Sequence, residues 1–242
     1  MNLLNQALLK FYKENLLHLD VSSETSKNLS VPLLVQASDT YEQNPEKRTF
    51  IIGQETYGWG GGNIGFDFMS YQKDNIREER MMECYQDFIV NAYGKKKHGV
   101  SPFWRAFREL ASETKDECLF ETNLLWTNLL AMDYDGKSML RMKNISDREK
   151  VIAYSKKKIL SEIEILKPKV CILFTGPHYD PIVKEIFGIA PGEGETISTK
   201  YPIRHLKKFT WNNIQFFRTY HPGYLNRGHW ETMDIVKKFL LP

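Results

Sequence analysis

Three groups of polar side chains follow apolar runs of this chain and carry chemically useful groups. Gln54 and Glu55 come directly after one run, Asn128 follows a second, and His221 follows a third. Open α/β sheets place their ligand crevice outside the carboxyl ends of the strands. We therefore expect Glu55, Asn128 and His221 to face a common hollow. A solvated glutamate, an asparagine that caps a helix and a histidine bonded to backbone are the plainer alternatives.

Each of these side chains offers a different chemical capability. A carboxylate such as Glu55 can hold or deprotonate an attacking water. The amide of Asn128 presents both a hydrogen-bond donor and an acceptor. A neutral imidazole at His221 can donate a hydrogen bond to a group on which negative charge develops.

The elements that must position these groups can be read from hydrophobic patterning. Runs rich in β-branched, aromatic and other apolar residues predict strands at residues 49–52, 118–125, 170–174 and 214–220. Amphipathic or capped stretches predict helices between them, and a loop is expected over residues 189–208. Strands that alternate with helices indicate an α/β fold with a mostly parallel sheet of four strands. We expect a three-layer α/β/α sandwich.

Length and composition favour one domain. The chain has 242 residues, 42% of them hydrophobic, without a polar linker or internal repeat. We therefore assign residues 1–242 to a single domain, with residues 1–45 as a helical and irregular N-terminal extension of it.

Composition also limits the cellular compartments and the kinds of binding partner to be expected. The formal net charge of +3 permits contact with nucleic acid without arguing for it. Three widely spaced cysteines, Cys84, Cys118 and Cys171, predict free thiols in a reducing compartment and no structural zinc or iron–sulfur site. We expect no metal site and no cofactor. The N-terminus has no signal-peptide pattern, and no apolar run approaches the roughly 20 residues that span a bilayer. We expect a cytoplasmic protein without a membrane partner, and a monomer.

Three segments resemble the uracil-DNA glycosylase superfamily. GQETYG at residues 53–58 resembles the motif Gly-Gln-Asp-Pro-Tyr-His, which activates water in that family. LLWTN at 124–128 ends on an Asn where the family keeps its base-recognising Asn, and HPGYLN at 221–226 resembles His-Pro-Ser-Pro-Leu-Ser. KPKVCILFTG at 167–176 resembles the family's third strand. The order and approximate spacing match over roughly residues 45–240, which makes the chain similar to a divergent member.

The departures from the family motifs bear on the substrate. Glu55 replaces the usual Asp, Thr56 the Pro and Gly58 the His of the first motif, whereas Gly223 and Tyr224 replace Ser and Pro in the last. Loss of a side chain at Gly58 raises the hypothesis of a wider pocket for a substituted base. The glycines at 60, 62 and 65 also form a G-x-G-x-x-G, but the residues after them do not begin an obvious helix, which argues against a dinucleotide site.

The resemblance implies a catalytic role for each polar residue. Breaking the bond between a base and its deoxyribose yields an oxocarbenium-like sugar and an anionic base, after the nucleotide has been extruded from the duplex. His221 would stabilise the leaving pyrimidine through its O2 atom. Glu55 would hold or deprotonate water, or place negative charge under the sugar cation. Gln54 would contribute contacts near the base.

The resemblance also implies a set of base-recognition residues. Asn128 would read the Watson–Crick edge of a pyrimidine, with Asn123 as a second candidate. Tyr57 would pack against C5 of the base. Phe68, or Phe66 if loop lengths differ, would stack on the extruded base, although a core aromatic is nearly as good an interpretation of either.

DNA contacts are expected around the last motif. Leu225 stands where the family's apolar wedge enters the duplex. Other residues expected to contact DNA are Gly53, Gly223, Tyr224 and Arg227. Basic residues of two further segments could contact phosphates. They are Lys95, Lys96, Lys97, Arg204, Lys207 and Lys208. Both segments are equally well interpreted as solvated loops.

Together these observations predict a monofunctional DNA glycosylase that flips a uracil or modified pyrimidine and leaves an abasic site. Base-excision repair and defence against modified foreign DNA both fit, and the DNA substrate can be single- or double-stranded. The alternatives are a catalytically silent DNA-binding homologue and a nucleoside- or nucleotide-binding hydrolase.

Overall fold

The computed structural model describes most of the chain and divides it into two compact units. The described residues are 1–16, 19–60, 67–73, 78–94, 101–111, 122–225 and 230–240. Unit 1 comprises Met1–Ala37, Glu55–Asp87 and Thr127–Leu166. Unit 2 comprises Ser38–Gln54, Phe88–Trp126 and Lys167–Pro242.

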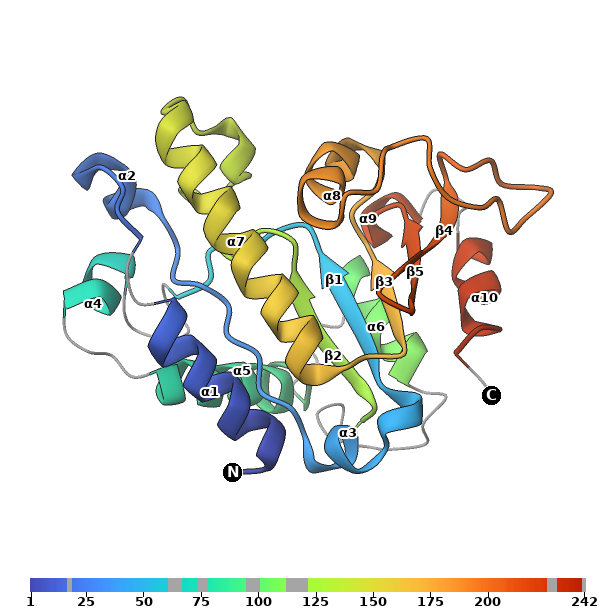
Figure 1. Ribbon diagram of the computed structural model, residues 1–242, viewed down its shortest axis with the longest axis horizontal. Coiled ribbons are helices and arrows are strands. Elements are labelled where there is room, and N and C mark those ends of the chain that lie inside the picture. The colour runs from blue at the N-terminus through green and yellow to red at the C-terminus, as the bar shows by residue number, and fades with distance from the viewer. Residues whose placement is uncertain are drawn as a thin grey trace. The chain divides into compact units, whose positions relative to one another are not determined.

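A five-stranded sheet with the order β2-β1-β3-β5-β4 organises unit 2, to which all of its residues belong except Thr127 and Asn128 at the end of β2 (Figure 1). The strands are β1 (Thr49–Gly53), β2 (Leu124–Asn128), β3 (Val170–Leu173), β4 (Leu206–Trp211) and β5 (Ile214–Thr219). β3 pairs in parallel with both β1 and β5, with Ile172 opposite Ile51 and Phe217. Every residue of β1 and β3 is buried, as expected for parallel strands covered on both faces. The predicted α/β class with a mostly parallel sheet is confirmed.

The prediction of four strands was wrong, because β4 adds an antiparallel edge strand that begins at Leu206, within the last three residues of the loop expected over 189–208. β4 pairs with β5 from Leu206–Thr219 to Trp211–Ile214. Asn212 and Asn213, which join them, have φ angles of 47° and 62°. Positive φ at both central residues is the geometry of a two-residue type I′ hairpin turn, which asparagine tolerates. Phe209 of β4 stacks on Phe216 of β5 with ring centroids 5.0 Å apart.

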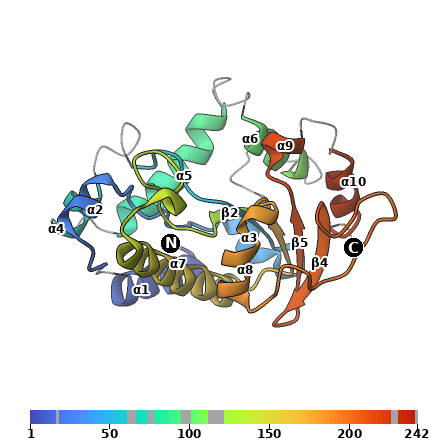
Figure 2. The same cartoon turned by 90° about the horizontal axis from the view of Figure 1, so that it is seen from above.

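Helices of unit 2 pack on and beside this sheet. Their bounds are α3 (Asp39–Gln43), α6 (Pro102–Ala111), α8 (Asp180–Phe187), α9 (Pro222–Leu225) and α10 (Glu231–Lys237), with short 3₁₀ helices at Pro45–Lys47 and Pro177–Tyr179. α6 lies beside α9, and α10 packs on β5 (Figure 2). The apolar stripe of α6 brings Phe103 and Trp104 into an aromatic cluster with Trp126, whose ring lies 5.9 and 4.8 Å from theirs.

Unit 1 is mainly helical. Its helices are α1 (Leu3–Asn15), α2 (Ser23–Asn28), α4 (Phe68–Lys73), α7 (Ile145–Leu166) and α5 (Glu78–Gly94), whose residues after Asp87 belong to unit 2. A short 3₁₀ helix spans Met139–Arg141. α1 runs alongside α7 (Figure 1), and α2 contacts α4. Asp147 in the first turn of α7 accepts hydrogen bonds from the hydroxyls of Ser22 (2.6 Å) and Thr25 (2.7 Å), which joins α2 to α7.

Each unit contains a buried ionic group. In unit 1, Lys158 pairs with Glu162 at 2.7 Å, and Tyr12 donates to the same carboxylate at 2.6 Å. Lys158 also donates to the hydroxyl of Thr127 at 3.1 Å. Burial lowers the pKa of Lys158, although the negative charge of Glu162 opposes that shift. These bonds tie the end of β2 to α7.

In unit 2, Asp180 at the start of α8 faces two buried cations, Arg218 of β5 at 3.1 Å and Lys207 of β4 at 3.5 Å. Burial is also the main cause of the lowered pKa of both cations. Among the described residues, no helix is both long and apolar enough to cross a membrane.

Candidate functional site

The carboxyl ends of β1, β3 and β5 lie along one edge of the sheet in unit 2, and the residues that follow them meet there. The side-chain amide of Gln54 donates to the carbonyl oxygen of Thr175 at 2.8 Å. The N–H of Gly176 donates to the carbonyl of Thr219 at 2.9 Å. Gly176 has a φ of +68°, and a Cβ there would lie 3.8 Å from the backbone nitrogen of His221. Gln54 and His221 therefore flank the same Thr175–Gly176 turn.

The imidazole of His221 is held by the first turn of α9. The N–H of Gly223 donates to Nδ1 of His221 at 3.1 Å. Nδ1 is therefore an acceptor, and a neutral ring with this bond carries its proton on Nε2. A Cβ at residue 223 would lie 3.2 Å from Nδ1, so the glycine permits this close approach.

An aromatic ring from α6 covers the same imidazole. The ring of Phe103 stacks on His221 with centroids 6.1 Å apart and an interplanar angle of 25°. Phe103 in turn meets Phe174, the residue after β3, edge to face at 5.8 Å. Burial lowers the pKa of His221 below its ordinary value because desolvation disfavours the charged ring. The imidazole is therefore neutral near pH 7, with Nε2–H as a donor.

In unit 1, the loop that begins with Glu55 is built around a buried carboxylate. Asp133, 1% exposed, accepts hydrogen bonds at Oδ2 from the Thr56 hydroxyl (2.7 Å) and the Gly58 N–H (2.9 Å). Its Oδ1 accepts from the Gly136 N–H at 3.0 Å, and Ser30 bonds to its backbone. Sequence reasoning missed Asp133. Its one signal was an acid placed directly after the apolar run LLAM.

Glu55 is half-buried, and its carboxylate is already engaged in this structure. Its Oε2 accepts a hydrogen bond from the backbone N–H of Met139 at 2.7 Å. A solvated surface glutamate is therefore not the correct description. Gly58 has a φ of +69°, and no atom of the described residues, its two chain neighbours aside, lies within 4 Å of a Cβ built there. This backbone angle favours glycine.

Asn128 is the last residue of β2 and is 3% exposed. The alternative that it caps a helix is wrong, because the next helical turn in the described chain is the 3₁₀ helix at Met139–Arg141. Asn123 precedes β2, and its carbonyl accepts from the N–H of Thr49 at 2.9 Å. Thus the two asparagines occupy opposite ends of the strand.

The two aromatic residues expected at the base occupy contrasting positions. Tyr57 is 89% exposed, so in this structure its ring does not form a wall of a closed pocket. Phe68 begins α4, is 1% exposed and lies 6.2 Å from the ring of Tyr71, which matches the core interpretation. Phe66 lies outside the described residues.

The residues expected to contact DNA also differ from one another in solvent exposure. Gly53 ends β1 and is buried, whereas Gly223 and Tyr224 are exposed in α9, with Tyr224 47% accessible. Leu225 is the last residue of α9. Arg227 and the lysines at 95–97 lie outside the described residues.

Of the other basic candidates, Arg204 is exposed, and Lys208 is half-buried and lies 3.8 Å from Glu195. Lys207 is fully buried against Asp180, so the suggestion that it contacts phosphate was wrong.

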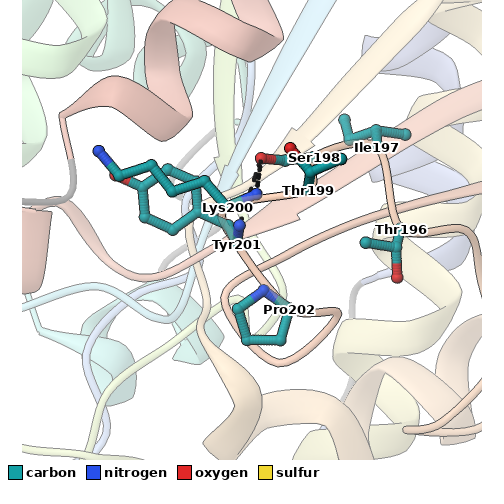
Figure 3. Close-up of a pocket in the computed structure, with 7 residues that line it drawn as sticks. All are labelled: Thr196, Ile197, Ser198, Thr199, Lys200, Tyr201 and Pro202. Carbon is teal, nitrogen blue, oxygen red and sulfur yellow. Dashed lines mark hydrogen bonds between the residues drawn. The ribbon is translucent and has the colours of Figure 1, made fainter.

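A separate hollow of about 550 Å³ lies in unit 2 and contains none of the predicted site residues. One loop, Thr196–Pro202, lines it (Figure 3). Within that loop the Ser198 hydroxyl accepts from the N–H groups of Lys200 and Tyr201, both at 3.2 Å. Among the described residues, no group of three or more His, Cys, Asp or Glu side chains is arranged to hold a metal ion.

The expectation of a common hollow joins residues of both units, Glu55 and Asn128 from unit 1 and His221 from unit 2, and it stays a prediction. Within unit 2, the structure brings Gln54 and His221 to one turn. Within unit 1, it ties the Glu55 loop to Asp133. Comparison of the chain with protein-family models and with curated proteins gives no match.

Proposed function

We propose that this protein is a monofunctional DNA glycosylase that extrudes a uracil or modified pyrimidine, hydrolyses its N-glycosidic bond and leaves an abasic site. The three motifs in family order support this proposal, and so does the mostly parallel sheet that carries two of them at its carboxyl edge. The proposal includes a three-layer α/β/α arrangement of the uracil-DNA glycosylase type.

The state of His221 is the observation that carries the proposal. Gly223 fixes Nδ1 as an acceptor, burial keeps the ring neutral, and Nε2–H is left as the donor. A neutral donor suits a leaving pyrimidine, because charge grows on O2 as the bond from C1′ to the base breaks.

The reaction balances with water as the only co-reactant. The electron pair of the C1′–N1 bond leaves with the base, whose O2 receives the hydrogen bond from His221. Water adds to C1′ of the sugar cation and loses a proton, for which Glu55 is the proposed acceptor. Gln54 is proposed to contact the base, and Asn128 to read its Watson–Crick edge through a donor and an acceptor. Phe68 has no role in this proposal because its ring is buried.

A base-release assay tests the proposal directly. Oligonucleotides that carry uracil, hypoxanthine or a substituted cytosine, as single strands and as duplexes, are incubated with protein and then cleaved at abasic sites with alkali. We expect release of at least one pyrimidine and loss of release in His221→Ala and Glu55→Gln. Release of uracil alone would contradict a pocket widened for substituted bases.

Two matched variants control for unspecific damage. His178→Ala removes an exposed histidine of unit 2, and Glu149→Gln neutralises an exposed glutamate of unit 1. Both should release base at the wild-type rate. DNA binding without release from any oligonucleotide would favour the catalytically silent homologue, and cleavage of free nucleosides alone would favour a nucleoside hydrolase.

A further inference from the structure

One aromatic side chain of the loop after β1 is turned out to solvent while its neighbours are buried. Tyr57 is 89% exposed, whereas Thr56 is 4% and Trp59 is 6% exposed. This is the largest exposed fraction among the exposed large hydrophobic side chains of the described residues. Scattered exposed apolar residues are common on proteins, so the way in which this one is held decides its meaning.

Both chain neighbours of Tyr57 are bonded to the same buried carboxylate, Thr56 through its side chain and Gly58 through its backbone. Asp133 accepts from the Thr56 hydroxyl at 2.7 Å and from the Gly58 N–H at 2.9 Å. Ser30 Oγ lies 3.1 Å from the Thr56 hydroxyl, and Gly58 adopts the left-handed backbone that completes the turn. Buried groups therefore impose the conformation that projects the ring, which distinguishes Tyr57 from a side chain on a loose loop.

The surroundings of Tyr57 fit a small planar partner. A protein partner needs a contiguous apolar patch of several hundred Å². Around Tyr57 the described loop offers a half-buried glutamate, an exposed glycine and buried Thr56 and Trp59, but no such patch. A single exposed ring can still stack on a nucleobase, because every base has a π-face. Tyr57 also directly follows the dipeptide Glu55-Thr56, which brings it close to the proposed water-holding carboxylate.

We propose, on the basis of the proposed function, that Tyr57 stacks on an unpaired or unstacked nucleobase of the DNA strand that carries the target. This role replaces the expected one, in which the ring forms a wall against C5 of the extruded base. Such a wall requires a buried ring, whereas Tyr57 is exposed and presented on a fixed turn. Base extrusion leaves neighbouring bases without a stacking partner, which an exposed tyrosine can supply.

Binding to DNA without base release tests this inference independently of catalysis. The probes are a single strand and a duplex that carry a tetrahydrofuran abasic analogue, with 2-aminopurine at the adjacent position. Fluorescence anisotropy gives the dissociation constant, and 2-aminopurine emission reports stacking of that base. The variants are Tyr57→Phe, which keeps the ring, and Tyr57→Leu and Tyr57→Ser, which remove it. Leu3→Ser, at a site 74% exposed in unit 1, is the matched control.

We expect Tyr57→Phe and Leu3→Ser to bind as tightly as wild type within about twofold. Tyr57→Leu and Tyr57→Ser should bind at least about fivefold more weakly and should fail to quench 2-aminopurine, since a stacked base contributes at least that much affinity. Wild-type affinity and quenching in Tyr57→Ser would overturn the inference. If base release occurs but binding is insensitive to Tyr57, the glycosylase proposal stands and the stacking inference fails. If binding depends on the ring but no oligonucleotide releases a base, the stacking inference stands and the glycosylase proposal fails. If the protein binds neither probe, the stacking inference fails, and the base-release assay alone decides the glycosylase proposal.

Discussion

Replacing Asp133 with alanine should loosen the loop that carries Glu55 and Tyr57. The carboxylate accepts four hydrogen bonds, from the Thr56 hydroxyl and from the N–H groups of Gly58, Trp59 and Gly136. After the substitution, the Thr56 hydroxyl retains Ser30 Oγ at 3.1 Å, and the Trp59 bond was already long at 3.4 Å. Two well-formed backbone donors, Gly58 and Gly136, lose their partner.

The expected magnitude follows from those two donors. Leaving a buried donor unsatisfied costs about 1–3 kcal/mol. Gly58 is exposed and Gly136 half-buried, so water can partly replace the carboxylate. We expect Asp133→Ala to lower the free energy of unfolding by about 2–4 kcal/mol. Asp133→Asn should lose about half as much, because its amide oxygen can still accept from Thr56 and Gly58 while its NH₂ group faces Gly136.

Hydrogen exchange measures the loosening of the loop, and urea denaturation measures the loss of stability. The amides of Gly58 and Gly136 should exchange much faster in Asp133→Ala, and the denaturation midpoint should fall. Asp135→Asn is the matched control, since the Asp135 side chain is 62% exposed and contacts the exposed Lys137. It should change stability by less than about 0.5 kcal/mol. Unchanged exchange at both glycines in Asp133→Ala would refute the reasoning.

Three further predictions concern other buried or shielded charges. Hydrogen bonds from the Ser22 and Thr25 side chains lower the pKa of Asp147, so this carboxylate stabilises the fold fully above the usual aspartate pKa of about 3.9 and loses that contribution as the pH falls through its lower folded pKa. The difference in urea midpoint between wild type and Asp147→Asn should therefore be large at pH 7 and shrink in acid, and a pH-independent difference would contradict this. Lys158→Met should lower stability by about 3–5 kcal/mol because Glu162 stays buried without its cation, whereas Lys158→Met combined with Glu162→Gln should recover much of the loss in the same denaturation assay; a double variant less stable than the single one would exclude this explanation. Phe103→Leu should uncover the His221 imidazole and raise its lowered pKa toward 6.5, which NMR titration of the ring protons measures, with Phe239→Leu, a ring of unit 2 packed on Phe217, as the variant that should leave it unchanged.

The sequence was sufficient for the elements that are apolar throughout. The continuous apolar runs FII and VCIL predicted buried parallel strands, and every residue of β1 and β3 is buried. Because the carboxyl ends of parallel strands share an edge, the pattern placed the polar residues after β1 and β5 at one edge, and Gln54 and His221 flank the Thr175–Gly176 turn there. The common hollow of Glu55, Asn128 and His221 stays a prediction.

The edge strand β4 was not predicted because its second and third residues are lysines, which are typical of an exposed loop. Lys207 resembles a loop residue, yet it is fully buried against Asp180, 27 residues earlier in the chain. The dipeptide Asn212-Asn213 was a readable hairpin signal, since both residues tolerate positive φ. β2 was placed too early in the sequence, so that Thr127 and Asn128, interpreted as following the strand, belong to it.

The anchor of the candidate loop could not be predicted from local sequence. The carboxylate of Asp133 accepts from a hydroxyl 77 positions away, and the other donors to that carboxylate are backbone amides, which leave no trace in residue types. Similarly, the spacing of Phe68 fits a stacking aromatic and a core aromatic equally well. Only its 1% exposure separates the two interpretations.

The way the two units share the polypeptide has a consequence for biosynthesis. The chain alternates between them in six segments, and one of the crossings falls between Gln54 and Glu55. Neither unit can be cut out as a contiguous fragment, and the segment Lys167–Pro242 must emerge from the ribosome before unit 2 holds all its strands. Nascent chains that stop before residue 206 lack β4 and β5, so the edge of β3 that pairs with β5 stays exposed. Such chains should depend on chaperones more than a protein whose domains emerge one after another.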